Sequence, residues 1–259
     1  MSKKTTFTSA LIAALSFTLG SAYAQPSLPP VEQLQAAAKK RDATAQYQLG
    51  LRHQLGLDVP QDSKEAAKLF RSAADARNPV PEAQLALGFA YANGDGLTAN
   101  DKEAFKYFSK AAEAGNVDAM FRLAYCYEKG IGTKPDAAEA ANYYLKAAEK
   151  GTLEAQFVIG RLYYAGAGVP QNYAEAAKWY RKAADRGLAT AQYALGNLYT
   201  TGQGVPRDYV EAYKWVAIAT AGGNVDASKR RDNLATLYRM TPAQVADAEK
   251  RAAGFKPVN

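Results

Sequence analysis

The chain has 259 residues, with 32 lysines and arginines against 25 aspartates and glutamates, a net charge of +7, one histidine and one cysteine. A single cysteine cannot form an internal disulfide, and one histidine with one cysteine cannot build a usual zinc site, so we expect no metal and no cofactor. The basic excess is mild and scattered along the chain, which favours a solvated surface over a nucleic-acid interface.

The first 24 residues are typical of a signal peptide for export. Lys3 and Lys4 provide a basic start, an apolar stretch covers residues 7–19, and Ala22-Tyr23-Ala24 places small residues where a signal peptidase cleaves. The apolar stretch is shorter than the ~20 residues of a transmembrane helix, so an uncut membrane anchor is the weaker alternative. We expect cleavage after Ala24 and a periplasmic or secreted protein without a membrane span.

Residues 31–41 follow Pro29-Pro30 and are predicted to form an N-terminal cap helix. They align with the second helix of a unit that recurs along the chain every 36 residues and is plainest in segments beginning at Ala83, Ala119, Ala155 and Ala191. A fifth copy begins at Ala45, two residues further off because Asn78-Pro79 is inserted. A period of this length indicates stacked units that each bury an apolar face against the next. We therefore predict one solenoid over residues 25–259, with repeats at about 42–77, 80–115, 116–151, 152–187 and 188–223.

The first helix of each unit carries an aliphatic residue four places after the leading alanine, a small residue at five and an aromatic residue at eight. These spacings place the residues on one helix face. The small residue is glycine in four units. Because glycine costs about 0.5–1 kcal/mol inside a helix relative to alanine, we expect a neighbouring helix to approach closely there.

A Gly-x-Gly turn follows each first helix, as at Gly94-Asp95-Gly96, and we interpret it as helix termination. Unit one differs, because Asp58 replaces the second glycine. Each second helix is predicted to begin at an Asp or Asn N-cap, with a Glu three residues later that returns to the N-cap amide. These pairs are Asp62 and Glu65, Asn100 and Glu103, Asp136 and Glu139, Asn172 and Glu175, and Asp208 and Glu211. Since capping accounts for them, we assign no acid a catalytic role.

Residues 224–253 are predicted to form C-terminal capping helices, and residues 254–259 a tail. The last helix is expected to begin at Thr241, because Pro242 and Gln244 complete the pattern of a capping box with proline at the first helical position.

The whole pattern, Ala-x-x-x-Leu-Gly-x-x-Tyr-x-x-Gly-x-Gly-Val-Pro-x-Asn/Asp-x-x-x-Ala-x-x-Trp-x-x-Lys-Ala-Ala-x-x-Gly, resembles the Sel1-like repeat, a relative of the tetratricopeptide repeat. Residues 155–187 match it nearly throughout, whereas unit one departs at His53 and Asp58, and unit three at Ala124. The resemblance implies an all-α, right-handed superhelix of antiparallel helix pairs that serves as an adaptor or scaffold. Some relatives are cysteine-rich and linked to penicillin binding; this chain lacks those cysteines, so that activity is not carried over.

Places that vary between units are the candidates for binding, because the fold does not fix them. The third, sixth and tenth places after the leading alanine share one face of the first helix. They predict an apolar to basic groove centred on Phe89, Arg122, Tyr125 and Arg161, with Leu51, Lys129 and Asn197 also in the set. Aromatic residues and arginine most often dominate binding energy. The alternative is that several of these side chains only contact the next unit.

We therefore expect a non-catalytic, monomeric scaffold of the bacterial periplasm or envelope that binds a protein or peptide in this groove. A cell-wall or exopolysaccharide scaffold that binds glycan is the alternative, although Trp179 and Trp215 are predicted to be buried. A hydrolase is disfavoured, because His53 is the one candidate base for a triad and occupies a structural aromatic place. Glycoside hydrolysis by paired carboxylates is formally possible.

Overall fold

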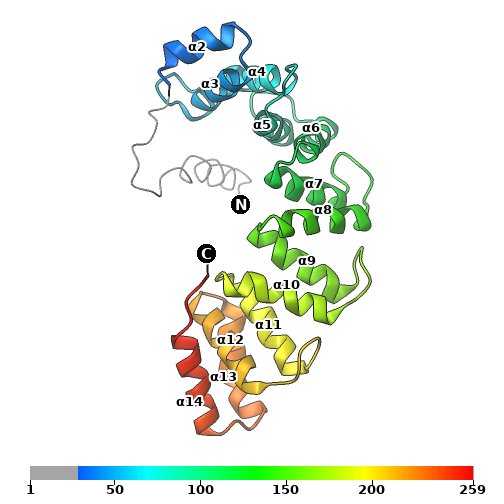
Figure 1. Ribbon diagram of the computed structural model, residues 1–259, viewed down its shortest axis with the longest axis vertical. Helices are drawn as coiled ribbons and strands as arrows, with labels where there is room; N and C mark the ends of the chain where they lie inside the picture. The colour runs from blue at the N-terminus through cyan, green and yellow to red at the C-terminus, as the bar shows by residue number, and fades with distance from the viewer. Residues whose placement is uncertain (1–28, 259) are drawn as a thin grey trace.

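The computed structural model describes residues 29–258, which form a curved array of antiparallel helix pairs (Figure 1). The predicted signal peptide, residues 1–24, lies outside the described residues. Between residues 29 and 258 the helices are α2 (Val31–Lys39), α3 (Ala43–Leu55), α4 (Ser63–Ala74), α5 (Pro81–Asn93), α6 (Asp101–Glu113), α7 (Val117–Lys129), α8 (Ala137–Glu149), α9 (Leu153–Ala165), α10 (Tyr173–Asp185), α11 (Ala189–Thr201), α12 (Tyr209–Ala221), α13 (Val225–Leu237) and α14 (Pro242–Ala253).

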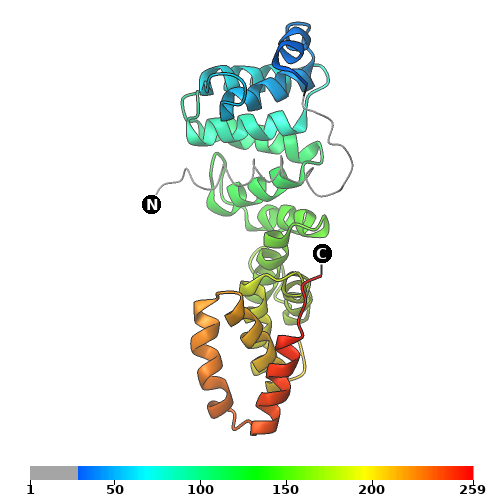
Figure 2. The same cartoon turned by 90° about the vertical axis from the view of Figure 1, so that its left-hand side faces the viewer.

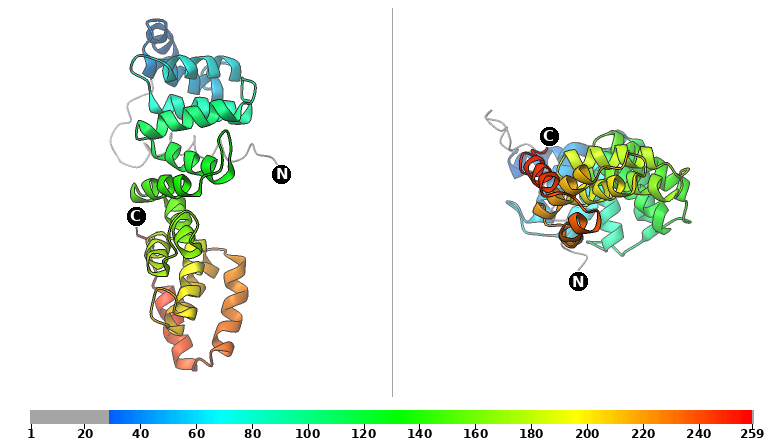
Figure 3. Two further views of the ribbon diagram at one scale, coloured as in Figure 1. Left: turned by 90° about the vertical axis from the view of Figure 1, so that its right-hand side faces the viewer. Right: turned by 90° about the horizontal axis from the view of Figure 1, so that it is seen from below.

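The helices pack in chain order, each on the one before it and the one after it, until α12, on which both α13 and α14 pack. The result is a long, narrow stack, as Figure 2 and Figure 3 show from its sides. This arrangement confirms the predicted fold class, an all-helical repeat solenoid. Within residues 29–258, no helix has the length and apolar character needed to cross a membrane.

The glycine inside a first helix is the point at which the second helix of the same unit approaches. A Cβ atom on Gly88 of α5 would lie 2.6 Å from the Phe108 ring of α6, and one on Gly160 of α9 would lie 2.7 Å from the Tyr180 ring of α10. The expected close approach is therefore confirmed. The tryptophans of the second helices are buried as predicted, with 5% of Trp179 and 2% of Trp215 exposed.

The second helices begin at the predicted N-caps, but the predicted role of the glutamates is wrong. In α8 the Asp136 side chain accepts hydrogen bonds from the amides of Ala138 and Glu139, at 3.0 Å each. The Asp136 amide is not available to Glu139, because it donates to the carbonyl of Tyr127 in the first helix at 2.9 Å. The equivalent amides in the other units donate in the same way. In four second helices the glutamate pairs instead with a lysine three residues on, namely Lys68, Lys106, Lys178 and Lys214.

The second glycine of each Gly-x-Gly turn forms the junction with the preceding unit. A Cβ atom on Gly168 would lie 1.9 Å from the carbonyl oxygen of Ala137, at the start of α8. One on Gly204 would lie 2.1 Å from the carbonyl oxygen of Tyr173, at the start of α10. The turn therefore ends one helix and also lets two units meet backbone to backbone.

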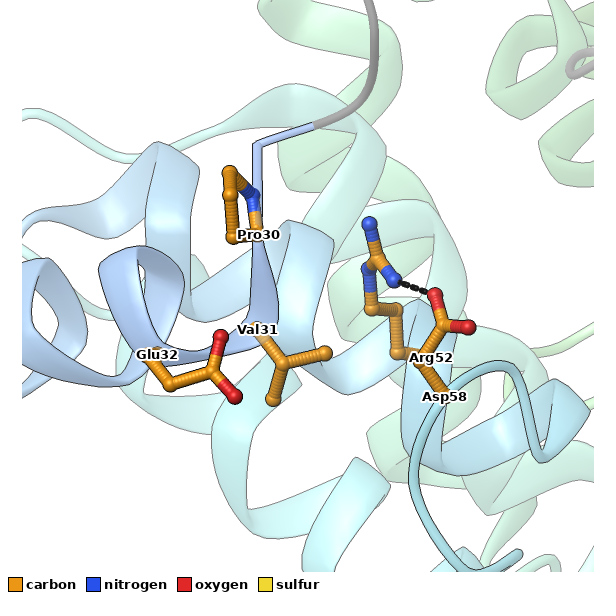
Figure 4. A pocket seen from close by; sticks show the side chains of 5 residues that line it. All are labelled: Pro30, Val31, Glu32, Arg52 and Asp58. Carbon is orange, nitrogen blue, oxygen red and sulfur yellow. Dashed lines mark hydrogen bonds and ion pairs between the residues drawn. The ribbon is translucent and has the colours of Figure 1, made fainter.

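Where the cap helix α2 meets the first unit, an ion pair takes the place of this backbone contact. Asp58 has a φ of +59° and its carboxylate pairs with the guanidinium of Arg52, which is only 7% exposed. Arg52 also donates to the carbonyl of Pro29 at 3.0 Å. The pair lines a pocket together with Pro30, Val31 and Glu32 at the start of α2 (Figure 4). The departure from the repeat at Asp58 thus belongs to the attachment of the cap helix.

The residues after α14 pack back onto the array. The Phe255 ring meets Trp215 of α12 edge to face, with ring centres 5.7 Å apart. The Val258 amide donates to the carbonyl of Asp185, the last residue of α10, at 2.9 Å. The described part of the predicted tail, residues 254–258, therefore covers the apolar cluster between α10 and α12.

Candidate binding surface

The first helices α5, α7 and α9 carry a set of side chains that contains most of the predicted groove residues. We name it the first-helix surface and define it as Phe89, Arg122, Tyr125, Glu128, Lys129, Arg161 and Tyr164. Five of the seven predicted residues belong to it. It also includes two residues from the ninth place after the leading alanine, Glu128 and Tyr164, which the sequence analysis does not select.

Arg122 of α7 joins two neighbouring units. Its guanidinium carbon lies 5.0 Å from the ring centre of Phe89 on α5 and 6.0 Å from that of Phe121. Phe89 in turn packs edge to face on Phe108, with ring centres 5.3 Å apart. A cation over an aromatic face contributes about 0.5–1 kcal/mol at an exposed site. Among the ion pairs of residues 29–258, none involves Arg122.

Glu128 lies at the centre of the surface and links α7, α8 and α9. Its carboxylate accepts a hydrogen bond from the Tyr144 hydroxyl at 2.9 Å and one from the Lys129 ammonium at 2.9 Å. Arg161 of α9 lies 3.6 Å from the same carboxylate. Burial alone would raise the pKa of Glu128, but the hydrogen bonds from Lys129 and Tyr144 and the charge of Arg161 hold it below its usual value. Glu128 is therefore ionised at neutral pH.

Two tyrosines of the surface are exposed. Tyr125 is 43% exposed and Tyr164 is 39% exposed. The Lys129 ammonium lies 5.9 Å from the ring centre of Tyr125. The Tyr164 hydroxyl donates to the Gln203 side chain at 3.3 Å, and its ring packs on Tyr173 at 5.2 Å between centres. Aromatic rings held beside cations in this way are the residue types that most often carry binding energy.

The remaining two predicted residues, Leu51 and Asn197, are not part of the first-helix surface. Leu51 of α3 is half-buried and packs in the apolar cluster of α4 and α5. For Leu51, the alternative that the side chain contacts the next unit therefore holds. Asn197 of α11 is half-buried, and among the described contacts none joins its side chain to the first-helix surface. Glu128 and Tyr164 could have been found from spacing alone, because the ninth place is three residues beyond the sixth and so shares its helix face.

The residues that could do chemistry lie elsewhere and have structural surroundings. His53 is half-buried, with Nδ1 3.3 Å from the carbonyl oxygen of Pro60. Cys126 is 3% exposed, and its burial together with the nearby Asp101 carboxylate raises the pKa of the thiol to about 11. In the part of the chain described, no group of three or more His, Cys, Asp and Glu residues is placed to hold a metal ion. What the first-helix surface itself offers is binding, through cations, hydroxyls and aromatic rings.

Comparison with known proteins identifies the repeat. The family model described as Sel1 repeat matches residues 43–78, 81–116, 117–152, 153–188 and 189–224. One similar solved structure is a protective antigen present in uropathogenic Escherichia coli that displays an SLR fold, with 28% identity and a TM-score of 0.77 over 95% of this chain. Another is a Sel1 repeat protein from Oxalobacter formigenes, with 33% identity and a TM-score of 0.68 over 79% of this chain. A search of curated proteins gives no match.

This chain spans 53% and 59% of the lengths of those two proteins, so the likeness concerns the repeat array and not the whole of either relative. Sel1 repeat proteins are generally protein-interaction scaffolds, and the fold is typically non-catalytic. The matches fall in five consecutive copies from residue 43 to residue 224, and their boundaries follow the helix pairs α3–α4 to α11–α12. This chain belongs to the Sel1 repeat family.

Proposed function

We propose that this protein is an exported, non-catalytic scaffold that binds a protein or peptide partner on the first-helix surface. The observation that supports the proposal is the collection of exposed aromatic and cationic side chains on two consecutive first helices, α7 and α9. Tyr125, Arg161 and Tyr164 are each more than a third exposed, although they belong to helices whose other aromatic residues pack into the array.

These side chains add little to the contacts that join the units. The units meet backbone to backbone at the second turn glycine, as Gly168 meets Ala137 of the preceding unit. An exposed ion pair such as Arg161 with Glu128 contributes only about 0–1 kcal/mol to folding. A binding role gives these exposed residues a purpose that the fold does not.

A protein partner fits the surface better than a neutral glycan does. Sugar rings are commonly bound by stacking on exposed tryptophan, but Trp179 and Trp215 are both buried. The first-helix surface offers tyrosine and arginine, which are enriched in protein–protein interfaces.

The proposal of export rests on the signal-peptide pattern of residues 1–24. When the full chain is produced in a Gram-negative bacterium, we expect the protein in the periplasmic fraction or the medium to begin at Gln25. N-terminal sequencing checks this. Protein recovered from the cytoplasm with residues 1–24 intact would contradict export and leave the binding surface unaffected.

Site-specific photo-cross-linking tests where the partner binds. A photoreactive phenylalanine analogue replaces Tyr125 on the first-helix surface, and in a second protein it replaces Glu113, an exposed residue of α6. We expect a cross-linked protein adduct in envelope extract from position 125 and none from position 113. Adducts from both positions, or from position 113 alone, would contradict the assignment of the surface.

A further inference from the structure

We propose that the partner segment which binds the first-helix surface is an acidic, extended peptide whose carboxylates lie beside Arg122 and Arg161. The inference rests on the proposed function and names the chemistry of its partner. It follows from the charges on the surface, from the way the surface already holds one carboxylate, and from the tyrosines that flank it.

The seven residues that define the surface carry more positive than negative charge. Arg122, Lys129 and Arg161 provide three cations, and Glu128 is the one acid among the seven residues that define the surface. Lys129 and Arg161 share that acid, whereas Arg122 is held by the rings of Phe89 and Phe121. Opposite charges on a partner would therefore be complementary to this surface, and like charges would be repelled.

Glu128 shows how a carboxylate is held here. An ammonium at 2.9 Å, a tyrosine hydroxyl at 2.9 Å and a guanidinium at 3.6 Å converge on it. The Arg161 side chain is 49% exposed, and an arginine has five N–H donors, so it can bind a second carboxylate from solvent. Glu128 also opposes such binding, because its charge lies next to the incoming one. Glu128 is therefore expected to lower the affinity of the surface for acidic segments.

The tyrosines favour a peptide over a simple anion. Tyr125, beside Lys129, and Tyr164, on the next first helix, present exposed ring area that can cover the aliphatic parts of a peptide. An extended chain rises about 3.3 Å per residue, so a short segment can reach from α5 across α7 to α9. The arginines would bind the carboxylates of such a segment, and the tyrosine rings would pack on its aliphatic groups.

The test uses a fluorescent dodecapeptide of alternating Glu and Ala, with an alternating Gln and Ala peptide of the same length as its neutral counterpart. Anisotropy titration of residues 25–259 is expected to show at least about tenfold tighter binding of the acidic peptide, the ratio expected from one or two new charge pairs. Glu128→Gln is expected to tighten acidic-peptide binding about three- to tenfold, because it removes the competing charge.

Glu149→Gln is the matched control, since it changes the net charge equally at an exposed position at the end of the second helix α8. We expect it to leave the affinity unchanged within about twofold, because this charge is not on a first helix and exposed charges are screened by salt. Equal tightening by both variants would overturn the inference, since net charge alone would then explain it. Circular dichroism checks that Glu128→Gln folds. Arg122→Gln provides a second variant, with an expected loss of about fivefold.

Two results separate this inference from the proposed function. A cross-linked protein partner at Tyr125 without any preference for the acidic peptide would overturn the acidic chemistry and leave the scaffold function in place. Tighter binding of a uronic-acid polysaccharide than of the acidic peptide would overturn the peptide assignment in favour of an anionic glycan.

Discussion

Gly168→Ala is expected to destabilise the protein by about 3 kcal/mol or more, whereas Gly151→Ala is expected to remove only about 1–2 kcal/mol. Both glycines have positive φ, +74° at Gly168 and +94° at Gly151, so an alanine meets similar backbone strain at either position. They differ in their surroundings. A Cβ atom on Gly168 would lie 1.9 Å from the carbonyl oxygen of Ala137, whereas one on Gly151 would have no atom within 4 Å apart from the glycine and its two chain neighbours.

The overlap at Gly168 cannot be relieved by a side-chain rotation, because the opposing atoms belong to the backbone of α8. The junction between the third and fourth units must open instead. In a solenoid, stability comes from the units and from the contacts between neighbours, so one weakened junction can separate the unfolding of the two halves. Urea unfolding of the two variants gives both free energies. Equal losses at Gly168 and Gly151 would contradict the junction role of the second turn glycine.

Reversing the charge of both arginines, Arg122→Glu with Arg161→Glu, is expected to weaken partner binding at least about 30-fold, or about 2 kcal/mol. Each change turns an attraction for an acidic partner into a repulsion, and a glutamate at position 161 would also lie beside Glu128. The effect on folding is expected to be about 1–2 kcal/mol, because the variant loses one exposed ion pair and the two cation–aromatic contacts of Arg122. Isothermal titration with the captured partner measures the change in affinity.

The matched control is Lys146→Glu with Lys182→Glu, which changes the net charge equally. These exposed lysines of α8 and α10 lie over aromatic rings too, 4.7 Å from the centre of Tyr143 and 4.1 Å from that of Trp179. The control therefore loses similar contacts away from the first-helix surface. We expect it to bind with an affinity within about threefold of the original protein, since rim and remote charges change affinity little.

The fold was predictable because the same spacing of residues recurs in five units. An alanine, an aliphatic residue and an aromatic residue at fixed spacing fix the buried face of each first helix, and the in-helix glycine marks where the second helix crosses, as Gly88 and Phe108 show. The N-cap residues were predicted for the same reason. The role of the glutamates was not, because the amide to which they were assigned is satisfied by a carbonyl of another helix, and such a contact exists only after the pair has packed.

The binding surface was less predictable, because it depends on contacts between units. Helix spacing placed Arg122 and Tyr125 on one face, but it could not show that the Arg122 guanidinium lies over Phe89 of the preceding unit. It also could not show that Tyr144 and Arg161, from two other helices, converge on Glu128. Leu51 and Phe89 occupy the same place in their helices and both pack against the apolar core, but the Phe89 ring also lies beside the Arg122 guanidinium. The way in which neighbouring units stack determines which variable positions are exposed to a partner. Sequence spacing alone does not show this stacking.

The most direct test of protein binding by the first-helix surface is affinity capture from envelope extract on immobilised residues 25–259. The Arg122→Glu, Arg161→Glu variant and the Lys146→Glu, Lys182→Glu variant are immobilised in parallel, and purified peptidoglycan is offered separately. We predict that the original protein and the lysine variant retain the same specific protein and that the arginine variant does not. Retention of that protein by all three, or retention of peptidoglycan in place of any protein, would contradict the claim that the first-helix surface is a protein-binding site.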